Sequence, residues 1–449
     1  MKTISKRKIF TAAFLILFFG LCFTSNVFAV SYVYVQNNTS LEFSVNTVQT
    51  GDHTLDSDEW WHKTGTIVPW QKKTLALWAN RDEGIHNRDN FYFTTNLSNG
   101  SEQVSLQLKL RGKLVHSSMW QSLSGNGFNH GWYSDRNWHQ QTFTMAGKSI
   151  TVKYCAYYTG HDDDLLYIIQ ENEPYTQNIE DPNSIHILSY NIYMLSGILG
   201  KDQDIRAQAI PDHVRGYDVI VFNEAFDNDA RENILIPALR DEYPYRTNVL
   251  DKSGALEDGG VVIVSKWPIE DTETSIYNDC ISEDCLSAKG VLYVRINKMG
   301  KIYNIFGTHT QAWNSTEEQV QARLNQLQQL RNFIDELNIS GTEPVIVAGD
   351  LNVDSYANAF DEYNRMFEIL DAQVPSYAGH PYTFDPNFNL YASGNVREYL
   401  DYILSIDGWL QPLTSLNEVR ILRSITDDME GWDLSDHFGV YGHFTYPDI

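Results

Sequence analysis

Hydrophobic and polar positions follow different patterns on the two sides of residue 184. Between residues 31 and 178, short β-prone runs alternate with turn clusters such as those at 36–39 and 99–100, and helical periodicity is scarce. This pattern is typical of a β-sandwich. After residue 184, apolar strand-like runs alternate with amphipathic segments, which indicates a larger domain that contains both strands and helices. Helices are expected at about 202–214, 229–241, 315–338 and 356–370.

Five apolar runs of the second region end in polar residues. An ionised carboxylate at the end of a buried strand must be paired, hydrogen-bonded or bound to a cation. Because side chains alternate along a strand, Asp350 and Asn352 are expected to point into the same pocket. A strand-end turn would explain that pair alone. Polar residues at the ends of five apolar runs, however, predict that these ends form a shared site. The five ends carry Asn191, Glu224, His309, Asp350 with Asn352, and Ser435-Asp436-His437.

The first 29 residues have the composition of a secretory signal peptide. Four basic residues precede an apolar core at 9–23, and a short run at 27–29 leads to Val30. We therefore expect a signal peptide at 1–29 and a secreted protein. No later run approaches 18 apolar residues, so a soluble mature chain is expected.

The chain without this leader is strongly acidic. Removing four basic residues and no acidic ones takes the formal net charge from −25 to −29. Polyanion-binding proteins need a basic face, and no run of Lys and Arg supplies one, so nucleic acid is disfavoured as a partner. Clustered carboxylates favour a divalent cation instead.

Three cysteines remain after the leader. Cys280 and Cys285 are close in sequence and, in an exported protein, could form a disulfide around a small loop. Cys155 is then left over, and we expect it to be buried as a small apolar residue.

The region 30–178 is expected to be an accessory domain, joined to the second domain by an acidic linker at 179–184. Seven of the eleven tryptophans lie in this region. Trp60 and Trp61 are adjacent, so on a strand one of them must face away from the core. Core packing explains most tryptophans, but an exposed one suits a membrane interface or a carbohydrate. We therefore expect this domain to bind membrane lipid or a surface glycan.

Seven short motifs follow one another in the second region. They are Tyr-Asn-Ile-Tyr-Met-Leu at 190–195, Phe-Asn-Glu-Ala-Phe-Asp-Asn at 222–228, Glu-Asp-Gly-Gly at 257–260, Gly-Thr-His at 307–309, Gly-Asp-Leu-Asn at 349–352, Glu-Tyr-Leu-Asp-Tyr at 398–402 and Ser-Asp-His at 435–437. In this order they resemble the bacterial neutral sphingomyelinases, which are magnesium-dependent phosphodiesterases of the DNase I-like endonuclease/exonuclease/phosphatase superfamily. The resemblance covers 185–449 and implies an α+β fold, a four-layer α/β/β/α sandwich, preceded here by a smaller all-β sandwich.

The resemblance also implies a general base. His437 would take a proton from the attacking water, because imidazole titrates near neutrality and Asp436 can help to set its environment. Asp401 is expected to orient a histidine without contacting the substrate. For either histidine of the motifs taken alone, a structural role is an equal alternative.

Further roles follow for the other strand ends. Asp350 and Asn352 would position the water and the phosphate, and Asn191 and His309 would donate hydrogen bonds to the developing charge. His309 could alternatively protonate the leaving oxygen.

The metal expected from the resemblance is Mg²⁺, held by Glu224, and Mn²⁺ or Co²⁺ could take its place. A second metal position of the family matches Asn228, Glu257 and Asp258. The glycines at 259 and 260 permit an unusual turn there. A solvated acidic loop is the competing explanation.

One segment departs from the family. Relatives carry an aromatic-rich hairpin just before the Ser-Asp-His motif, and it is thought to dip into the membrane. Here residues 426–432 are shorter and acidic, and burial of their carboxylates in lipid would be costly. We therefore expect the tryptophan-rich accessory domain to provide membrane attachment, with residues 195–199 as a second contact.

The expected function is that of a secreted enzyme that splits sphingomyelin into ceramide and phosphocholine and could act as a haemolysin. A secreted nuclease or another phospholipase C would use the same residues, although the negative charge argues against a nuclease. A second alternative is a membrane-binding, pore-forming toxin in which the C-terminal domain is auxiliary.

Overall fold

The computed structural model describes residues 30–81, 84–114, 117–125, 127–160, 162–172, 180–197, 200–313, 316–357, 359–424 and 433–448. Parts of the segments considered above lie outside these ranges. They are the expected signal peptide, residues 173–179 at the end of the expected accessory domain and the start of the linker, residues 198–199 of the second expected membrane contact, and the acidic segment at 426–432.

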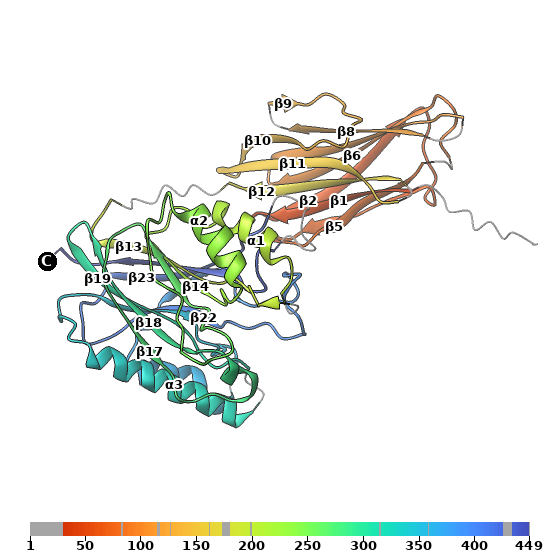
Figure 1. The fold of residues 1–449 in the computed structure, drawn as a ribbon. Coiled ribbons are helices and arrows are strands. Elements are labelled where there is room, and N and C mark those ends of the chain that lie inside the picture. Colours follow the sequence, from red (N-terminus) through yellow and green to blue (C-terminus); the bar gives the residue numbers. More distant parts are fainter. Residues whose placement is uncertain are drawn as a thin grey trace, which may run out of the picture.

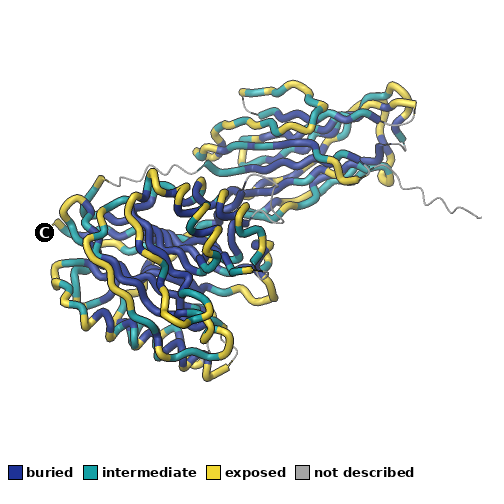
Figure 2. Tube along the Cα trace, viewed as in Figure 1, coloured by how far each residue is buried: buried dark blue, intermediate teal, exposed yellow. Residues whose placement is uncertain are grey.

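The residues up to Glu171 form a sandwich of two six-stranded sheets, which we call the accessory domain (Figure 1). Its strands are β1 Val30–Asn38, β2 Phe43–Gly51, β3 Trp60–His62, β4 Gly65–Ile67, β5 Thr74–Asn80, β6 Asn90–Asn99, β7 Glu102–Arg111, β8 Ser118–Gly125, β9 Phe128–Asn129, β10 His139–Met145, β11 Lys148–Tyr158 and β12 Asp163–Glu171. The sheets have the orders β10-β11-β12-β1-β5-β3 and β4-β2-β6-β7-β8-β9. Alternate side chains of strands such as β6 are buried in the core between the sheets (Figure 2).

The residues from 184 onward form a larger C-terminal domain with two further sheets. Its strands are β13 Ser184–Asn191, β14 Val219–Asn223, β15 Tyr245–Arg246, β16 Val262–Ser265, β17 Ile269–Ile276, β18 Gly290–Lys298, β19 Lys301–His309, β20 Val345–Asp350, β21 Ser376–Gly379, β22 Asp401–Ser405, β23 Thr414–Arg420 and β24 Gly439–Thr445. The sheets have the orders β15-β16-β14-β13-β24-β23-β21 and β17-β18-β19-β20-β22. Their central strands are buried, because one face packs on the other sheet and the other face packs on helices.

Helices cover both outer faces of this pair of sheets. The helices are α1 Gln203–Ala209, η2 Ile210–Asp212, η3 Ala230–Leu235, α2 Ile236–Leu239, η4 Ser282–Leu286, α3 Glu317–Glu336, η5 Ala359–Asp361 and α4 Glu362–Leu370. Side chains of α1 and α2 pack on the seven-stranded sheet, and those of α3 and α4 pack on the five-stranded sheet. The expected four-layer α/β/β/α sandwich with a preceding all-β sandwich is thus confirmed.

Local sequence explains where the helices begin and end. Thr316 caps α3 and forms a capping box with Gln319, and leucines at helical spacing bury one face of this helix. Expected helices at 202–214 and 229–241 are instead composite. In each, a proline lies at the start of a second, shorter segment, Pro211 in η2 and Pro237 in α2, because proline lacks the N–H that continues a helix.

Other expectations can be compared with the structure. Cys280 and Cys285 form the expected disulfide, and Cys155 is buried. Trp60 packs on the accessory core, whereas the neighbouring Trp61 is 43% exposed.

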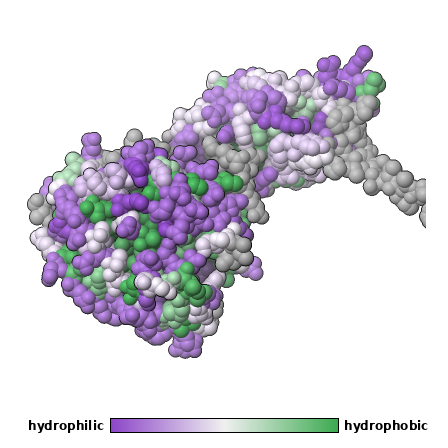
Figure 3. All heavy atoms as spheres, viewed as in Figure 1, coloured by the Kyte–Doolittle hydropathy of each residue, from purple (hydrophilic) through white to green (hydrophobic). Residues whose placement is uncertain are grey.

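None of the helices in the described ranges is long and apolar enough to cross a membrane. On the face shown in Figure 3, apolar side chains form small groups within a mostly hydrophilic surface.

Candidate active site

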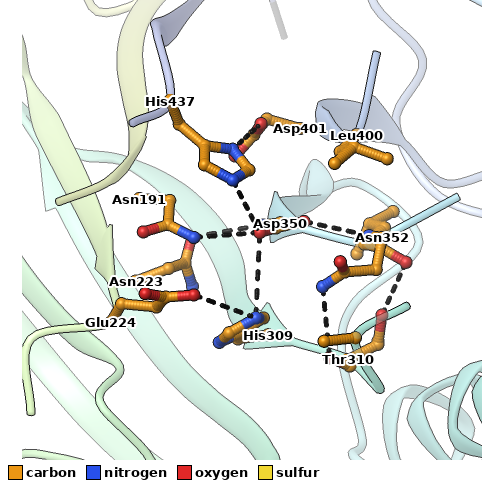
Figure 4. Close-up of polar contacts among 12 residues, drawn as sticks. Asn191, Asn223, Glu224, His309, Thr310, Asp350, Asn352, Leu400, Asp401 and His437 are labelled. Carbon is orange, nitrogen blue, oxygen red and sulfur yellow. Dashed lines mark hydrogen bonds and ion pairs between the residues drawn. The ribbon is translucent and has the colours of Figure 1, made fainter. Parts of the chain in front are cut away.

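Strand ends from both sheets of the C-terminal domain bring the predicted polar residues together (Figure 4). In the five-stranded sheet, the pairing register aligns His309 with Asp350 and Asp350 with Asp401. In the seven-stranded sheet, Asn191 pairs with Asn223 at the ends of β13 and β14. The backbone N–H of Asp350 donates to Asn223 Oδ1 at 3.2 Å. This bond joins the two sheets at the site.

The carboxylate of Asp350 lies at the centre of the group. Its Oδ2 accepts a hydrogen bond from Asn191 Nδ2 at 3.0 Å. The same oxygen lies 3.7 Å from His309 Nε2 and 3.8 Å from His437 Nε2. Burial and the nearby charge of Asp401 raise the pKa of Asp350 to about 6. The ionised carboxylate of Asp350 can therefore accept a hydrogen bond from a water placed between the two histidines, and its protonated form can donate one to a phosphate oxygen.

Asn352 does not lie on the strand that carries Asp350. The strand β20 ends at Asp350, and Asn352 has a left-handed backbone conformation with φ 52°. Its backbone N–H donates to Asp350 Oδ1 at 3.0 Å, and its side-chain amide donates to the carbonyl of Thr310 at 3.3 Å. The argument that strand alternation gives the two side chains one shared face is therefore wrong, because alternation ends with the strand.

His437 faces a carboxylate with each ring nitrogen. Its Nδ1 lies 2.8 Å from Asp401 Oδ2, and its Nε2 lies on the side of Asp350. Burial lowers the pKa of His437, but Asp401 and Asp350 more than offset this and raise it well above 6.5. Asp436 accepts a hydrogen bond from Ser435 Oγ at 3.3 Å and acts on the ring through its charge.

His309 contacts a buried lysine that sequence reasoning missed. Lys289 is 5% exposed, and its Nζ lies 3.2 Å from His309 Nε2 and donates to the carbonyl of Thr310 at 2.7 Å. Asp284, inside the loop closed by the disulfide, lies 3.5 Å from the same Nζ. Burial and then the charge of Lys289 hold the pKa of His309 well below 6.5, so His309 is neutral near pH 7. No motif marks Lys289 in the sequence.

Glu224, one residue past β14, completes a cluster that fits a divalent cation. One ligand atom each from Glu224, His309 and Asp350 lie within 4.8 Å of one another. Burial and the charge of Asp436 raise the pKa of Glu224 to about 7. A bound cation would offset both causes, because it favours the ionised carboxylate that burial and Asp436 disfavour. Carboxylate oxygens suit Mg²⁺, and the imidazole is also acceptable to Mn²⁺ and Co²⁺.

The residues of the expected second metal position contact other groups. Asn228 Oδ1 and Asp258 Oδ2 both accept hydrogen bonds from the guanidinium of Arg231, the latter at 3.0 Å. Glu257 accepts a hydrogen bond from Ser196 Oγ. Arg231 is 2% exposed, so a buried cation already binds two of the three predicted ligands. The second metal position stays a prediction.

Comparison with known proteins shows which family this region of the chain matches. Residues 188–437, which include all the predicted site residues, match the model of the Endonuclease/Exonuclease/phosphatase family. Sphingomyelinase C 2 from Leptospira interrogans (serovar Lai) is 37% identical over 61% of this chain. Sphingomyelinase C from Bacillus cereus is 34% identical over 58% of this chain. The chain spans 47% of the Leptospira protein, about half its length, and 88% of the Bacillus protein.

The structure is also similar to solved structures. A mutant beta toxin from Staphylococcus aureus with bound magnesium ions is 33% identical, covers 59% of this chain and 100% of its own, and superposes with a TM-score of 0.54. The similarity covers a length close to that of the C-terminal domain. The family model does not include β1–β12 of the accessory domain.

Proposed function

Since the chain belongs to the endonuclease/exonuclease/phosphatase family and, within it, to the bacterial sphingomyelinases, we propose that it hydrolyses sphingomyelin to ceramide and phosphocholine. The observation that carries the proposal is the meeting of Asn191, Glu224, His309, Asp350 and His437 at adjacent strand ends. Phosphodiester hydrolysis needs charge neutralisation, an activated water and a stabilised leaving group. These residues can provide all three.

We propose that Glu224 holds a divalent cation, with Asp350 and His309 beside it. When bound, such a cation neutralises charge on the phosphoryl group. Mg²⁺ is the expected ion because carboxylate and water are its preferred ligands.

His437 acts as the general base in this proposal. Asp401 fixes the ring by its contact with Nδ1 and leaves Nε2 directed toward Asp350. A water between Nε2 and the phosphorus loses its proton to Nε2 as its oxygen forms the new P–O bond. The P–O bond to the ceramide oxygen breaks, that oxygen takes up a proton from solvent water, and His437 returns its proton to solvent.

The surroundings of His309 favour one of its two proposed roles. A histidine that protonates the leaving oxygen must be in its positively charged imidazolium form at working pH. Burial and Lys289 instead hold the pKa of His309 well below 6.5. We therefore assign His309 to hydrogen bonding with the phosphate, together with Asn191.

Secretion and membrane attachment complete the proposal. The leader at 1–29 would direct export. The accessory domain would bind membrane lipid or a surface glycan, since Trp61 and Trp132 are 43% and 39% exposed. Action on the outer leaflet of host cells would make the protein a haemolysin.

The test is release of phosphocholine from sphingomyelin liposomes, with phosphatidylcholine liposomes and plasmid DNA in parallel, each with and without EDTA. We expect turnover of sphingomyelin that EDTA abolishes and that His437→Ala eliminates. His443→Ala is the matched control, because His443 lies on β24 and contacts Ser184 Oγ at 3.1 Å at the other end of β13. Cleavage of plasmid, or lysis that survives His437→Ala, would replace the proposal with a nuclease or a pore-forming toxin.

A further inference from the structure

A buried arginine joins the accessory domain to the segment that carries the general base. Arg423 follows β23 and is 2% exposed. Its Nε donates to Asp433 Oδ1 at 2.6 Å within the C-terminal domain. Its Nη1 donates to the carbonyl oxygen of Trp70 at 2.8 Å and lies 3.4 Å from Asn38 Oδ1, both in the accessory domain. One guanidinium therefore binds acceptors of both domains.

A lysine of the accessory domain makes a second link. Lys72 Nζ donates to the carbonyl oxygens of Pro386 at 2.8 Å and Asn389 at 3.0 Å. Burial lowers the pKa of Lys72, and the nearby charge of Asp433 opposes this shift. The accessory domain thus supplies a partly buried cation to the loop at 385–390. Trp70 also packs against the core of the C-terminal domain.

Both links lead to His437 through a short series of hydrogen bonds. Asn389 Nδ2 donates to the carbonyl oxygen of Ser435 at 2.7 Å. Ser435 Oγ donates to the carbonyl oxygen of Asn191 at 2.6 Å and accepts the backbone N–H of His437 at 3.2 Å. Asn389, which accepts from Lys72, therefore helps to fix the backbone on which the general base lies.

The same segments are held from the other side by the carboxylate of Asp433. Its Oδ2 accepts the backbone N–H of Leu390 at 2.9 Å, while its Oδ1 binds Arg423. Burial of charged groups is unfavourable unless each is paired. Loss of the accessory groups would leave the carbonyl oxygens of Pro386 and Asn389 without their Lys72 donor and Nη1 of Arg423 without its accessory-domain acceptors, and the segments would have to rearrange.

We propose that the accessory domain is part of the active site's support, with Lys72 and Arg423 as positioning residues for His437, in addition to any role in membrane attachment. This inference rests on the proposed function, in which His437 is the general base. It extends that function because the support comes from outside the region matched by the family model. A domain that served only as a tether would leave turnover of a dissolved substrate unchanged.

The experiment compares Lys72→Met with Lys73→Met in the full-length protein. Lys73 is the exposed next residue, and its Nζ contacts the hydroxyl of Tyr157 within the accessory domain. The substrate is short-chain sphingomyelin below its critical micelle concentration, so no membrane is present. We expect Lys72→Met to lower kcat by roughly ten-fold with little change in KM, because small displacements of a catalytic group reduce turnover strongly. Lys72→Arg, which retains a donor, should recover part of the loss, and Lys73→Met should resemble the wild type.

Hydrogen exchange of the backbone amides at 433–438 gives a second measurement that needs no turnover. We expect faster exchange there in Lys72→Met than in Lys73→Met, with unchanged exchange in α3 and an unchanged thermal midpoint. Equal kcat and equal exchange in the two variants would overturn the inference, as would a general increase in exchange across both domains. A wild type that lacks sphingomyelinase activity would refute the proposed function alone, and the exchange data would still decide whether Lys72 positions this segment.

Discussion

Asp401→Asn removes the charge that orients His437 while it keeps the size and shape of the side chain. Asp401 Oδ2 lies 2.8 Å from His437 Nδ1, and both side chains are buried. The other carboxylate oxygen, Oδ1, has no hydrogen-bond partner among the described residues, so the substitution changes one hydrogen bond and, through the lost charge, lowers the pKa of Asp350. Asparagine has the same shape, but it can present an N–H to Nδ1 and stabilise the tautomer that carries its proton on Nε2.

The size of the effect follows from this contact. A buried hydrogen bond to a charged group contributes about 1.5–3 kcal/mol, which corresponds to roughly a 10- to 100-fold loss of kcat if it acts fully in the transition state. The wrong tautomer adds to this loss. In serine hydrolases the same substitution lowers kcat about 10⁴-fold. We therefore expect a decrease between ~10-fold and ~10⁴-fold.

The assay is the pH dependence of phosphocholine release. His437 must be neutral to accept a proton, and Asp401 raises its pKa. Asp401→Asn should therefore lower the plateau rate and also move the acidic limb to lower pH. Asp354→Asn is the matched control, because Asp354 is buried and, within the described ranges, its side chain accepts hydrogen bonds from the backbone N–H groups of Tyr356 and Tyr399 alone. An unchanged plateau in Asp401→Asn would refute the assignment of His437 as an oriented base.

Three further predictions concern the cation, the pH response and the disulfide. Glu224→Gln should lower turnover at least ~10²-fold and raise the Mg²⁺ concentration needed, measured by titration after EDTA treatment. In the metal-free wild type, burial lowers the pKa of His437 but its carboxylates raise it well above 6.5, so the ring should titrate with a midpoint above 6.5 in NMR spectra, and a midpoint below about 6 would contradict the assignment. The double substitution of Cys280 and Cys285 by Ser should lower stability by about 2 kcal/mol by urea unfolding. It should also reduce kcat several-fold, because the loop carries Asp284 to the lysine beside His309.

The residues of the site could be found in the sequence because each follows an apolar strand within a short motif. The parallel pairing of β19 and β20, which aligns His309 with Asp350, follows from two buried strands connected by the helix α3. The direction of the Asn352 side chain could not be found in this way. It depends on a left-handed residue after the strand, which the alternating pattern does not encode.

Contacts distant in sequence account for what sequence reasoning missed. Lys289 precedes β18 and reaches His309 only because β18 pairs with β19 in antiparallel register. Arg423 meets Trp70 across 353 positions of chain, and neither residue lies in a motif. Such contacts are set by how the domains pack, whereas motifs report only the local geometry that the chemistry requires.

The buried carboxylates of the site affect both the stability of the fold and the binding of a cation. Burial and neighbouring carboxylates raise the pKa values of Glu224 and Asp350. An acid whose pKa is higher in the folded state stabilises the fold at low pH, and this contribution is lost as pH rises from the unfolded toward the folded value. Near neutral pH, ionisation of these two acids therefore opposes folding. A divalent cation would offset this cost by neutralising the ionised carboxylates, so cation binding should raise the stability of the fold as well as support turnover.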